Sequence, residues 1–214
     1  KAAREARVHT CWEEPDAAYE QALQGFTQAV LADSFFRADL EAFVEQLVTP
    51  GRINSLSQVL LKLTAPGVPD FYQGTELWDL SLVDPDNRRP VDFTLRRRLL
   101  ASIENPDPDK IMAEMDSGLP KLHLIRTALH FRGQRPDLFA PGSAYLPLAV
   151  KGAQKDHVLG FLRGGQVGAI VPRRVMGFSG SWGDTRIELP EGRWENRLTG
   201  EIFSGPEFFL EEIL

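Results

Sequence analysis

The chain has 214 residues, of which 43% are hydrophobic and 25% are charged, a composition typical of globular proteins that allows one large domain or two small ones. The net charge of −6 argues against a broad electrostatic surface for nucleic acid. No apolar run approaches the roughly 18 residues that span a bilayer, so we expect neither nucleic acid nor a membrane as a partner.

The single cysteine and the first residues of the chain indicate the kind of protein from which it comes. Cys11 is the one cysteine, so no disulfide can form within the chain, which suits a reducing cytoplasm. The chain opens with KAAREARVHTCW, without a methionine and already in a charged, helix-like register. We therefore expect a piece of a longer, cytoplasmic protein.

Three helices are predicted in the first 65 residues. Apolar residues recur at i, i+3 and i+4 over 15–32, which predicts an amphipathic helix with Pro15 in its first turn. A second helix is predicted over 35–48, with Ser34 as its N-cap. A third is predicted over 52–63, and the Pro-Gly pair that follows it ends the helix.

The middle of the chain combines one short apolar segment with a long loop. Residues 68–73 are too few for a helix and are bounded by glycines, so they are predicted to form a buried strand. The loop over 74–90 is long enough to be functional. Helices are predicted over 93–104, 108–116 and 120–132. The arginine run at 96–98 is expected on a solvated helix face, and His123 and His130 at a surface or an interface.

The pattern changes after Arg135-Pro136. Short β-rich runs separated by Gly, Pro and Asp predict an antiparallel β-sandwich, with a domain boundary near residues 135–142. The fold class is thus α+β. One apolar strand flanked by helices cannot make a sheet alone, so its neighbours must come from outside these residues.

Five residues of the central segment carry a resemblance. Gly67, Pro69, Tyr72, Gly74 and Glu76 form the pattern G-x-P-x-x-Y-x-G-x-E, which resembles the last-strand motif of the α-amylase superfamily, glycoside hydrolase family 13. The resemblance implies the eighth strand of a (β/α)8 barrel, the turn after it and an all-β domain C. Residues 1–138 would then be the C-terminal part of the catalytic barrel with a helical insertion, and residues 139–214 would be domain C.

Longer stretches narrow the resemblance to one branch of that superfamily. KAAREARVHTCW, GVPDFYQGTELWDLSLVDPDNRRPVDF and LPEGRWENRLTGE are similar to enzymes that act on maltooligosaccharides in trehalose biosynthesis. This implies an intramolecular transglucosylase, an isomerase that converts the reducing-end α-1,4 linkage into an α,α-1,1 linkage. The branch has serine where Cys11 stands, a change conservative in size.

No catalytic residue is assigned within the chain. Retaining chemistry at an anomeric carbon needs two carboxyl groups about 5 Å apart, and the superfamily motifs that carry them are not found in this sequence. The acids near Asp86 adjoin Arg88 and Arg89, which would lower their pKa values and suit an ionic cluster better than a general acid. We therefore expect the isolated segment to be inactive, and we expect no metal or cofactor.

Several polar and aromatic residues are candidates to bind maltooligosaccharide. Loops at the C-terminal ends of barrel strands form the active face of this fold. The candidates are His9, Trp12, Trp78, Asp86, Asn87, Arg88 and Arg89. All except Trp12 have an alternative role: His9 could bond loop backbone, Trp78 could pack against the rim, and the loop residues could tie the loop to the barrel. Glu76 is expected to be structural, bonded to backbone or to an arginine.

Two other functions stay open at this point. One is a different α-amylase-family activity, such as a glucosidase or another transglycosidase. The other is a non-catalytic glycan-binding module that uses Trp182 or Trp194, although both could instead pack in the β core. If the chain is a piece of a barrel, helices over 15–63 cut from their strands would expose apolar faces, so we expect self-association of the chain.

Overall fold

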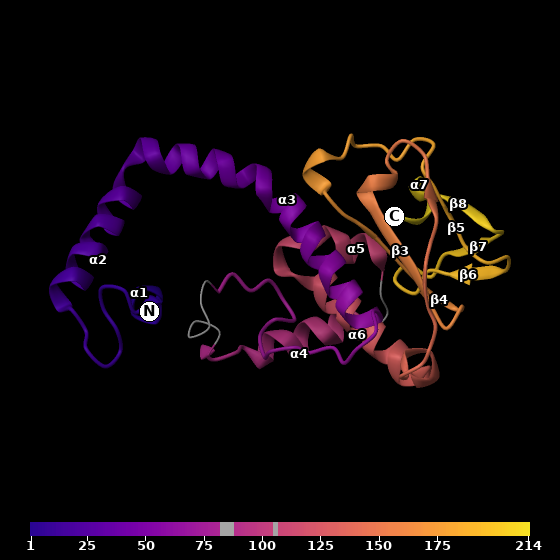
Figure 1. The fold of residues 1–214 in the computed structure, drawn as a ribbon, viewed down its shortest axis with the longest axis horizontal. Helices are drawn as coiled ribbons and strands as arrows, with labels where there is room; N and C mark the ends of the chain where they lie inside the picture. Colours follow the sequence, from indigo (N-terminus) through magenta and orange to yellow (C-terminus); the bar gives the residue numbers. More distant parts are fainter. Residues whose placement is uncertain (82–87, 105–106) are drawn as a thin grey trace. The chain divides into compact units, whose positions relative to one another are not determined.

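The computed structural model describes residues 1–81, 88–104 and 107–214 and combines helices with antiparallel sheets (Figure 1). The predictions for Asp86 and Asn87 therefore lie outside the described residues. The chain divides into two compact units, which are described separately: residues 1–49 with 79–91, and residues 50–78 with 92–214.

The first unit contains helix α1 (Ala2–Ala6), helix α2 (Ala17–Ala32) and the beginning of helix α3 (Ser34–Thr64). Helix α2 ends where the helix predicted over 15–32 ends but begins two residues later, so Pro15 precedes the helix and does not lie in its first turn. It begins after Asp16, whose side chain accepts a hydrogen bond from the Tyr19 backbone N–H at 2.9 Å. This carboxylate satisfies one of the amide groups that a helix leaves unpaired at its N-terminus.

Helix α3 corrects the prediction of two separate helices. It runs without a break through Pro50, where the prediction placed the gap between 35–48 and 52–63. Pro50 removes one backbone donor, and its neighbours Thr49 and Gly51 are poor helix formers, so the local sequence does not explain why the helix continues there. The N-cap is also different: the Asp33 side chain accepts from the Phe36 backbone N–H at 2.8 Å, in the place predicted for Ser34.

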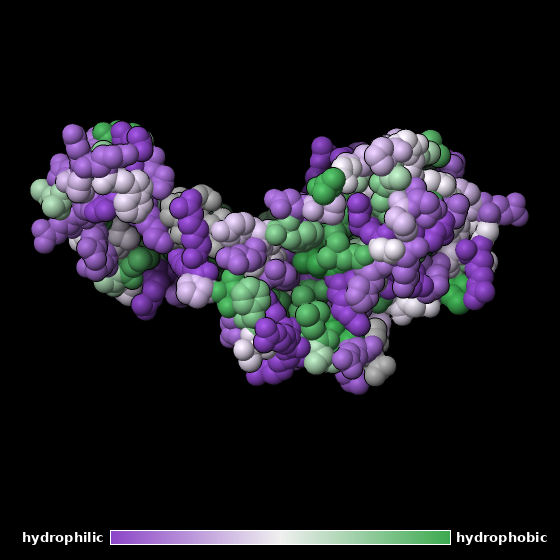
Figure 2. Space-filling view, turned by 90° about the horizontal axis from the view of Figure 1, so that it is seen from below, coloured by the Kyte–Doolittle hydropathy of each residue, from purple (hydrophilic) through white to green (hydrophobic). Residues whose placement is uncertain are grey.

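The apolar stripe of α2 and the first half of α3 reaches the surface of the described structure. No residue of α2 is buried. Figure 2 shows hydrophobic side chains at the surface among hydrophilic neighbours. The exposed members on these two helices are Leu23, Phe26, Leu31, Phe35, Phe36, Leu40, Phe43, Val44, Leu47 and Val48. Exposed apolar stripes of this kind mark surfaces that other polypeptide covers.

The second unit holds the other long helices and their core. Helices α4 (Phe93–Ser102), α5 (Pro108–Ala113) and α6 (Leu119–Gln134) lie close to the predicted ranges, and the 3-10 turn η2 (Met115–Ser117) separates α5 from α6. Two clusters of buried side chains hold them. One is Leu77, Ile103, Ile111, Leu119 and Leu122; the other is Val59, Leu63, Leu124 and Ile125.

Residues 68–73 do not form the predicted strand. They lie in an irregular segment after α3, and the Val68 side chain is 95% exposed. A strand is stable only when neighbours pair with its backbone, and among the described residues nothing pairs with this segment as a strand. The apolar sequence of this segment alone is therefore not sufficient to form a strand.

The chain changes from helices to strands between Gln134 and Tyr145, where the sequence predicts that change. The strands are antiparallel and form three small sheets, in the orders β1-β3-β4, β2-β5-β8 and β6-β7. They are β1 (Tyr145–Pro147), β2 (Val150–Lys151), β3 (Val158–Arg163), β4 (Val167–Pro172), β5 (Arg186–Glu188), β6 (Arg193–Glu195), β7 (Ile202–Ser204) and β8 (Glu207–Phe209).

Several short elements complete the second unit. They are the 3-10 turns η3 (Pro136–Phe139), η4 (Lys155–His157) and η5 (Val175–Gly177), and the terminal helix α7 (Leu210–Ile213). The β core is built on Val158, Ile187, Phe208 and Leu210. Within the described ranges, no helix is long and apolar enough to cross a membrane.

Candidate functional site

The first polar cluster lies in the first unit and is centred on Glu20 of α2. Arg4 donates from Nε to Glu20 Oε1 at 2.7 Å and from its terminal nitrogen to Oε2 at 2.6 Å. The Thr10 hydroxyl donates to Oε1 at 2.6 Å. The hydrogen bonds from Arg4 and then from Thr10 lower the pKa of Glu20 to about 2. Glu20 is therefore ionised at neutral pH and can only accept hydrogen bonds.

Trp12 joins this cluster, whereas His9 does not. The indole N–H of Trp12 donates to Glu5 at 2.9 Å, and the Arg4 guanidinium lies 5.1 Å from the ring centre. An open cavity of about 410 Å³ is lined by Ala3, Arg4, Trp12, Glu20, Leu23 and Gln24, among others. His9 is exposed and instead contacts Tyr19, with 5.0 Å between the ring centres.

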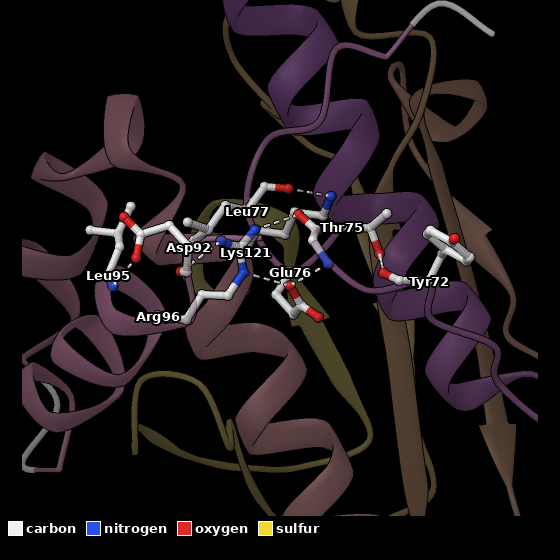
Figure 3. Close-up of polar contacts among 9 residues, drawn as sticks. Tyr72, Thr75, Glu76, Leu77, Asp92, Leu95, Arg96 and Lys121 are labelled. Carbon is white, nitrogen blue, oxygen red and sulfur yellow. Dashed lines mark hydrogen bonds and ion pairs between the residues drawn. The ribbon is translucent and has the colours of Figure 1, made fainter. Parts of the chain in front are cut away.

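The second polar cluster lies in the second unit, at the turn of the G-x-P-x-x-Y-x-G-x-E segment (Figure 3). The Tyr72 carbonyl accepts from the hydroxyl of Thr75 at 2.7 Å and from its backbone N–H at 3.1 Å. Gly74 has a φ of +94°, in the region that favours glycine. Its N–H donates to Glu76 Oε2 at 3.1 Å. The Glu76 side chain thus folds back onto its own turn.

Arg96 of α4 completes this cluster. Its Nε donates to Glu76 Oε2 at 2.8 Å, and its terminal nitrogens donate to the carbonyls of Gly74 at 2.7 Å and Asp92 at 3.1 Å. Asp92 is also the N-cap of α4, accepting from the Leu95 N–H at 2.8 Å. We call Arg96, Glu76, Gly74 and Asp92 the Arg96 clamp. It joins the residues just before loop 77–91 to the residues just after it.

The clamp corrects the expectation for the arginine run at 96–98. Arg97 and Arg98 are exposed, as a solvated helix face requires, but the Arg96 side chain is only 15% exposed. This role could not be read from the run itself, because three adjacent arginines do not show which side chain is buried. The i+4 spacing from the capping Asp92 was the available signal, since it brings Arg96 back over the first turn of α4.

Trp78 is held among structural contacts. Its indole N–H donates to the Met115 carbonyl at 2.6 Å. The Arg52 guanidinium and the Lys121 ammonium lie 5.9 and 5.7 Å from its ring centre. Lys121 is buried in α6 and donates to the Leu77 carbonyl at 3.0 Å (Figure 3). These contacts favour the packing role for Trp78 over the stacking of a sugar.

The remaining candidates lie at the surface or against the β core. Arg88 and Arg89 are exposed at the end of the loop. Trp182 packs on Phe178, with 4.4 Å between the ring centres, and Trp194 donates its indole N–H to the Pro190 carbonyl at 3.0 Å. Both tryptophans pack against the buried β cluster. The described residues contain no group of three or more His, Cys, Asp or Glu side chains that could hold a metal ion.

His123 is another buried titratable group that the sequence did not reveal. It was expected at a surface or an interface, but it is 7% exposed. One ring nitrogen, Nε2, lies 3.3 Å from the Leu198 carbonyl, while Nδ1 is buried without a hydrogen-bond partner among the described residues. Burial lowers the pKa of His123, because a charged ring would lose its water.

Known proteins resemble the chain over nearly its whole length. No family model matches. A Mycobacterium tuberculosis protein provisionally named maltooligosyl trehalose synthase is 39% identical over 206 residues, which is 96% of this chain and 25% of that protein. The structure of maltooligosyltrehalose synthase from Arthrobacter ramosus is 38% identical, with a TM-score of 0.84 over 99% of this chain and 27% of that one.

A solved structure with lower sequence identity gives the same kind of match. A hypothetical maltooligosyl trehalose synthase from Sulfolobus tokodaii is 32% identical, with a TM-score of 0.71, and covers 95% of this chain and 26% of that one. The chain thus spans about a quarter of the length of the relatives it matches. Over almost all of its residues, it matches a C-terminal portion of maltooligosyltrehalose synthase.

Proposed function

We propose that the chain is part of a maltooligosyltrehalose synthase, an intramolecular transglucosylase. The enzyme would convert the reducing-end α-1,4 linkage of a maltooligosaccharide into an α,α-1,1 linkage in trehalose biosynthesis. The observation that carries this proposal is the joint agreement of sequence and fold: 39% identity over 96% of the chain to one relative, and a TM-score of 0.84 to another. The single cysteine fits a cytoplasmic enzyme.

In the whole protein, residues 1–138 would belong to a (β/α)8 barrel with a helical insertion, and residues 139–214 to an all-β sandwich domain C. The segment from Gly67 to Glu76 would be the last barrel strand and its turn. Support comes from the motif itself and from the short antiparallel strands after Tyr145. In the whole protein this segment would pair with neighbouring strands from other parts of the chain, since a strand needs such partners to form.

Loop 77–91 would contribute to the sugar site from the rim of the barrel. Asp86, Asn87, Arg88 and Arg89 are polar groups that suit the hydroxyls of a sugar, since guanidinium and amide N–H groups donate and carboxylates accept. Loops placed by a rigid scaffold carry binding residues in many enzymes. The Arg96 clamp would supply that rigidity, because it fixes the two ends of the loop to each other.

The two catalytic carboxyl groups would come from other parts of the protein. This chain would then supply binding and positioning but no acid, base or nucleophile. To test this, purified chain and full-length protein are each incubated with maltopentaose, and reducing ends are counted. Full-length protein should remove reducing ends and yield a non-reducing product, while the chain alone should not. Release of glucose or maltose by the full-length protein would instead favour a glucosidase.

The exposed stripe on α2 and α3 would make the isolated chain self-associate. Leu40 and Phe43 lie on this stripe, and their apolar surface remains in contact with water in the described structure. Light scattering after size exclusion should show species larger than a monomer. Leu40→Ser with Phe43→Ser should shift the chain toward monomer, while Glu41→Ser, between them, should not. A monodisperse wild-type monomer would contradict this expectation.

A further inference from the structure

We infer that the turn between strands β6 and β7 is held on helix α6 by a latch that opens when His123 takes up a proton. The latch is the contact between the His123 ring and the Leu198 carbonyl, with 3.3 Å between Nε2 and the oxygen. Both residues belong to the second unit. The latch is a property of this part of the fold and does not depend on the proposed enzymatic activity.

The tip of the β6–β7 hairpin, residues 196–200, rests on α6 and α3. The Leu198 side chain packs against the buried cluster that these two helices share. The Arg197 guanidinium lies 5.7 Å from the ring centre of Phe131, which is also on α6. The His123 contact therefore lies at the centre of the surface on which the tip is docked.

The tip can leave α6 without unfolding the strands. Its own hydrogen bonds are internal: the Gly200 N–H donates to the Asn196 carbonyl at 2.7 Å, and the Leu198 N–H donates to the Asn196 side chain at 3.0 Å. At the base of the hairpin, Trp194 and Phe203 pack against the β core. A small element that is anchored at one end and docked by few contacts at the other can open locally.

The proton positions on His123 make the docked state sensitive to pH. A carbonyl oxygen only accepts, so the hydrogen bond to Leu198 requires a proton on Nε2. Nδ1 of the neutral ring then carries no proton, and it is buried without a hydrogen-bond partner among the described residues. A second proton would create a buried charge and a buried N–H that lacks an acceptor, and both are costly. Lifting the tip removes this cost, because water then reaches the ring.

The nearby charges oppose protonation in the docked state. Burial lowers the pKa of His123, and the positive charge of Arg126 on the same helix lowers it further. Charged groups on α6, on the hairpin and on α3 have partners of their own: Lys121 with the Leu77 carbonyl, Arg197 with Glu195, Glu201 with Thr199, Arg52 with Asp116, and Lys62 with the Asp70 carbonyl. In the open state the pKa returns toward its ordinary value of about 6.5. The docked state is thus favoured above about pH 6.5 and loses this advantage as the pH falls below it.

The test is hydrogen exchange of the full-length protein at pH 7.5 and 5.5, measured by mass spectrometry. Rates are expressed as protection factors, which remove the intrinsic effect of pH on exchange. Residues 196–200 should be less protected than β3 and β4, because local opening needs less free energy than unfolding of the unit. Their protection should fall by up to about tenfold between pH 7.5 and 5.5, since the open state gains the proton first.

Two variants identify the group that responds. His123→Gln keeps a side-chain N–H that can donate to the Leu198 carbonyl but does not titrate, so protection of the tip should be the same at both pH values. His130→Gln is the matched control, because His130 is exposed on the same helix, and it should keep the wild-type pH dependence.

Three results would overturn the latch. One is protection of the tip that does not change with pH in the unmodified protein. Another is equal protection of the tip and of β3 and β4, which would mean that the second unit opens as a whole; neither comparison needs a variant. The third is a wild-type pH dependence that persists in His123→Gln, which would assign the response to another group.

Discussion

Replacing Arg96 with alanine should destabilise the second unit more than any other single arginine truncation on α4. The substitution removes one ion pair to Glu76 and the hydrogen bonds to the Gly74 and Asp92 carbonyls. The side chains of Arg96 and Glu76 are 15% and 27% exposed. Water can therefore replace the lost donors only in part, and among the residues that the structure describes Glu76 keeps one hydrogen-bond donor, the Gly74 N–H.

The magnitude follows from this geometry. A hydrogen bond to a charged group contributes about 1.5–3 kcal/mol, and breaking a fully buried ion pair costs about 3–5 kcal/mol. Because the Glu76 carboxylate retains some contact with water, we expect a loss of about 2–3 kcal/mol for Arg96→Ala. For a chain of this size, that corresponds to a fall in Tm of roughly 4–12 °C.

Thermal and urea unfolding, followed by circular dichroism, give the first measurement. Arg97→Ala is the matched control, since Arg97 is exposed on the same turn of α4, and it should change stability by less than about 0.5 kcal/mol. A double-mutant cycle with Glu76→Ala should show coupling between the two positions. Hydrogen exchange at the Gly74 amide should also accelerate in the Arg96 variant, because the acceptor of that amide is no longer held in place.

Equal stability of the Arg96 and Arg97 variants would refute this reasoning. It would mean that the clamp is a surface contact whose strength is lost to solvent, as happens for many exposed ion pairs. Lysine at position 96 provides a further check. A point charge can approach Glu76 but cannot donate in three directions with fixed geometry, so Arg96→Lys should recover less than the full stability.

Three other predictions concern titration and backbone geometry. Burial lowers the pKa of His123, so the unfolded chain binds the proton more tightly than the folded chain. Stability that is present above about pH 6.5 should therefore be lost as the pH falls below that value. Urea midpoints at pH 5.5 and 7.5 should show this loss, and His123→Leu should make the loss smaller. The pKa of Glu20, lowered to about 2 by Arg4 and Thr10, should rise toward its ordinary value in Arg4→Ala, as carbon-detected NMR titration of the carboxylate would report; an unchanged pKa would exclude the pairing in solution. Gly118 has a φ of +79°, and a Cβ there would lie 3.1 Å from the Trp78 backbone nitrogen. Gly118→Ala should therefore lower the free energy of unfolding by more than about 1 kcal/mol. Gly133 lies in α6 with open space around it, so Gly133→Ala should be neutral or stabilising in the same denaturation assay.

The helices could be read from the sequence because their information is local. Periodic apolar residues and capping carboxylates such as Asp16 act within a few positions of each other, so α2, α4 and α6 lie close to their predicted ranges. The gap predicted between 35–48 and 52–63 was wrong, since Pro50 lies inside one continuous helix. The strand over 68–73 failed for the opposite reason: its stability depends on partners distant in sequence.

The candidate sites also divide into features set by nearby residues and features set by residues distant in the sequence. Trp12 was a candidate from the sequence, and the structure places it at a cavity with Glu20, a residue sixteen positions from its partner Arg4. The spacing from Asp92 could have marked Arg96, but neither its bond to the Gly74 carbonyl nor the bond of Lys121 to the Leu77 carbonyl could be predicted, because each acceptor is more than twenty residues away. Contacts to backbone leave no pattern in the identities of the residues that accept them.

The Arg96 clamp has a consequence for how such proteins can change. Because the clamp holds the two ends of the loop together, the residues between them do not have to fix the positions of those ends. Beyond Leu77 and Trp78, which are held in the second unit, doubling the length of the loop would then add only about 0.6 kcal/mol of closure entropy. Insertions and exchanged sequences could be accommodated there while helix α4 and the turn at Gly74 stay in place. The clamp would thus let the rest of this loop change in sequence and length at little cost to the stability of the second unit.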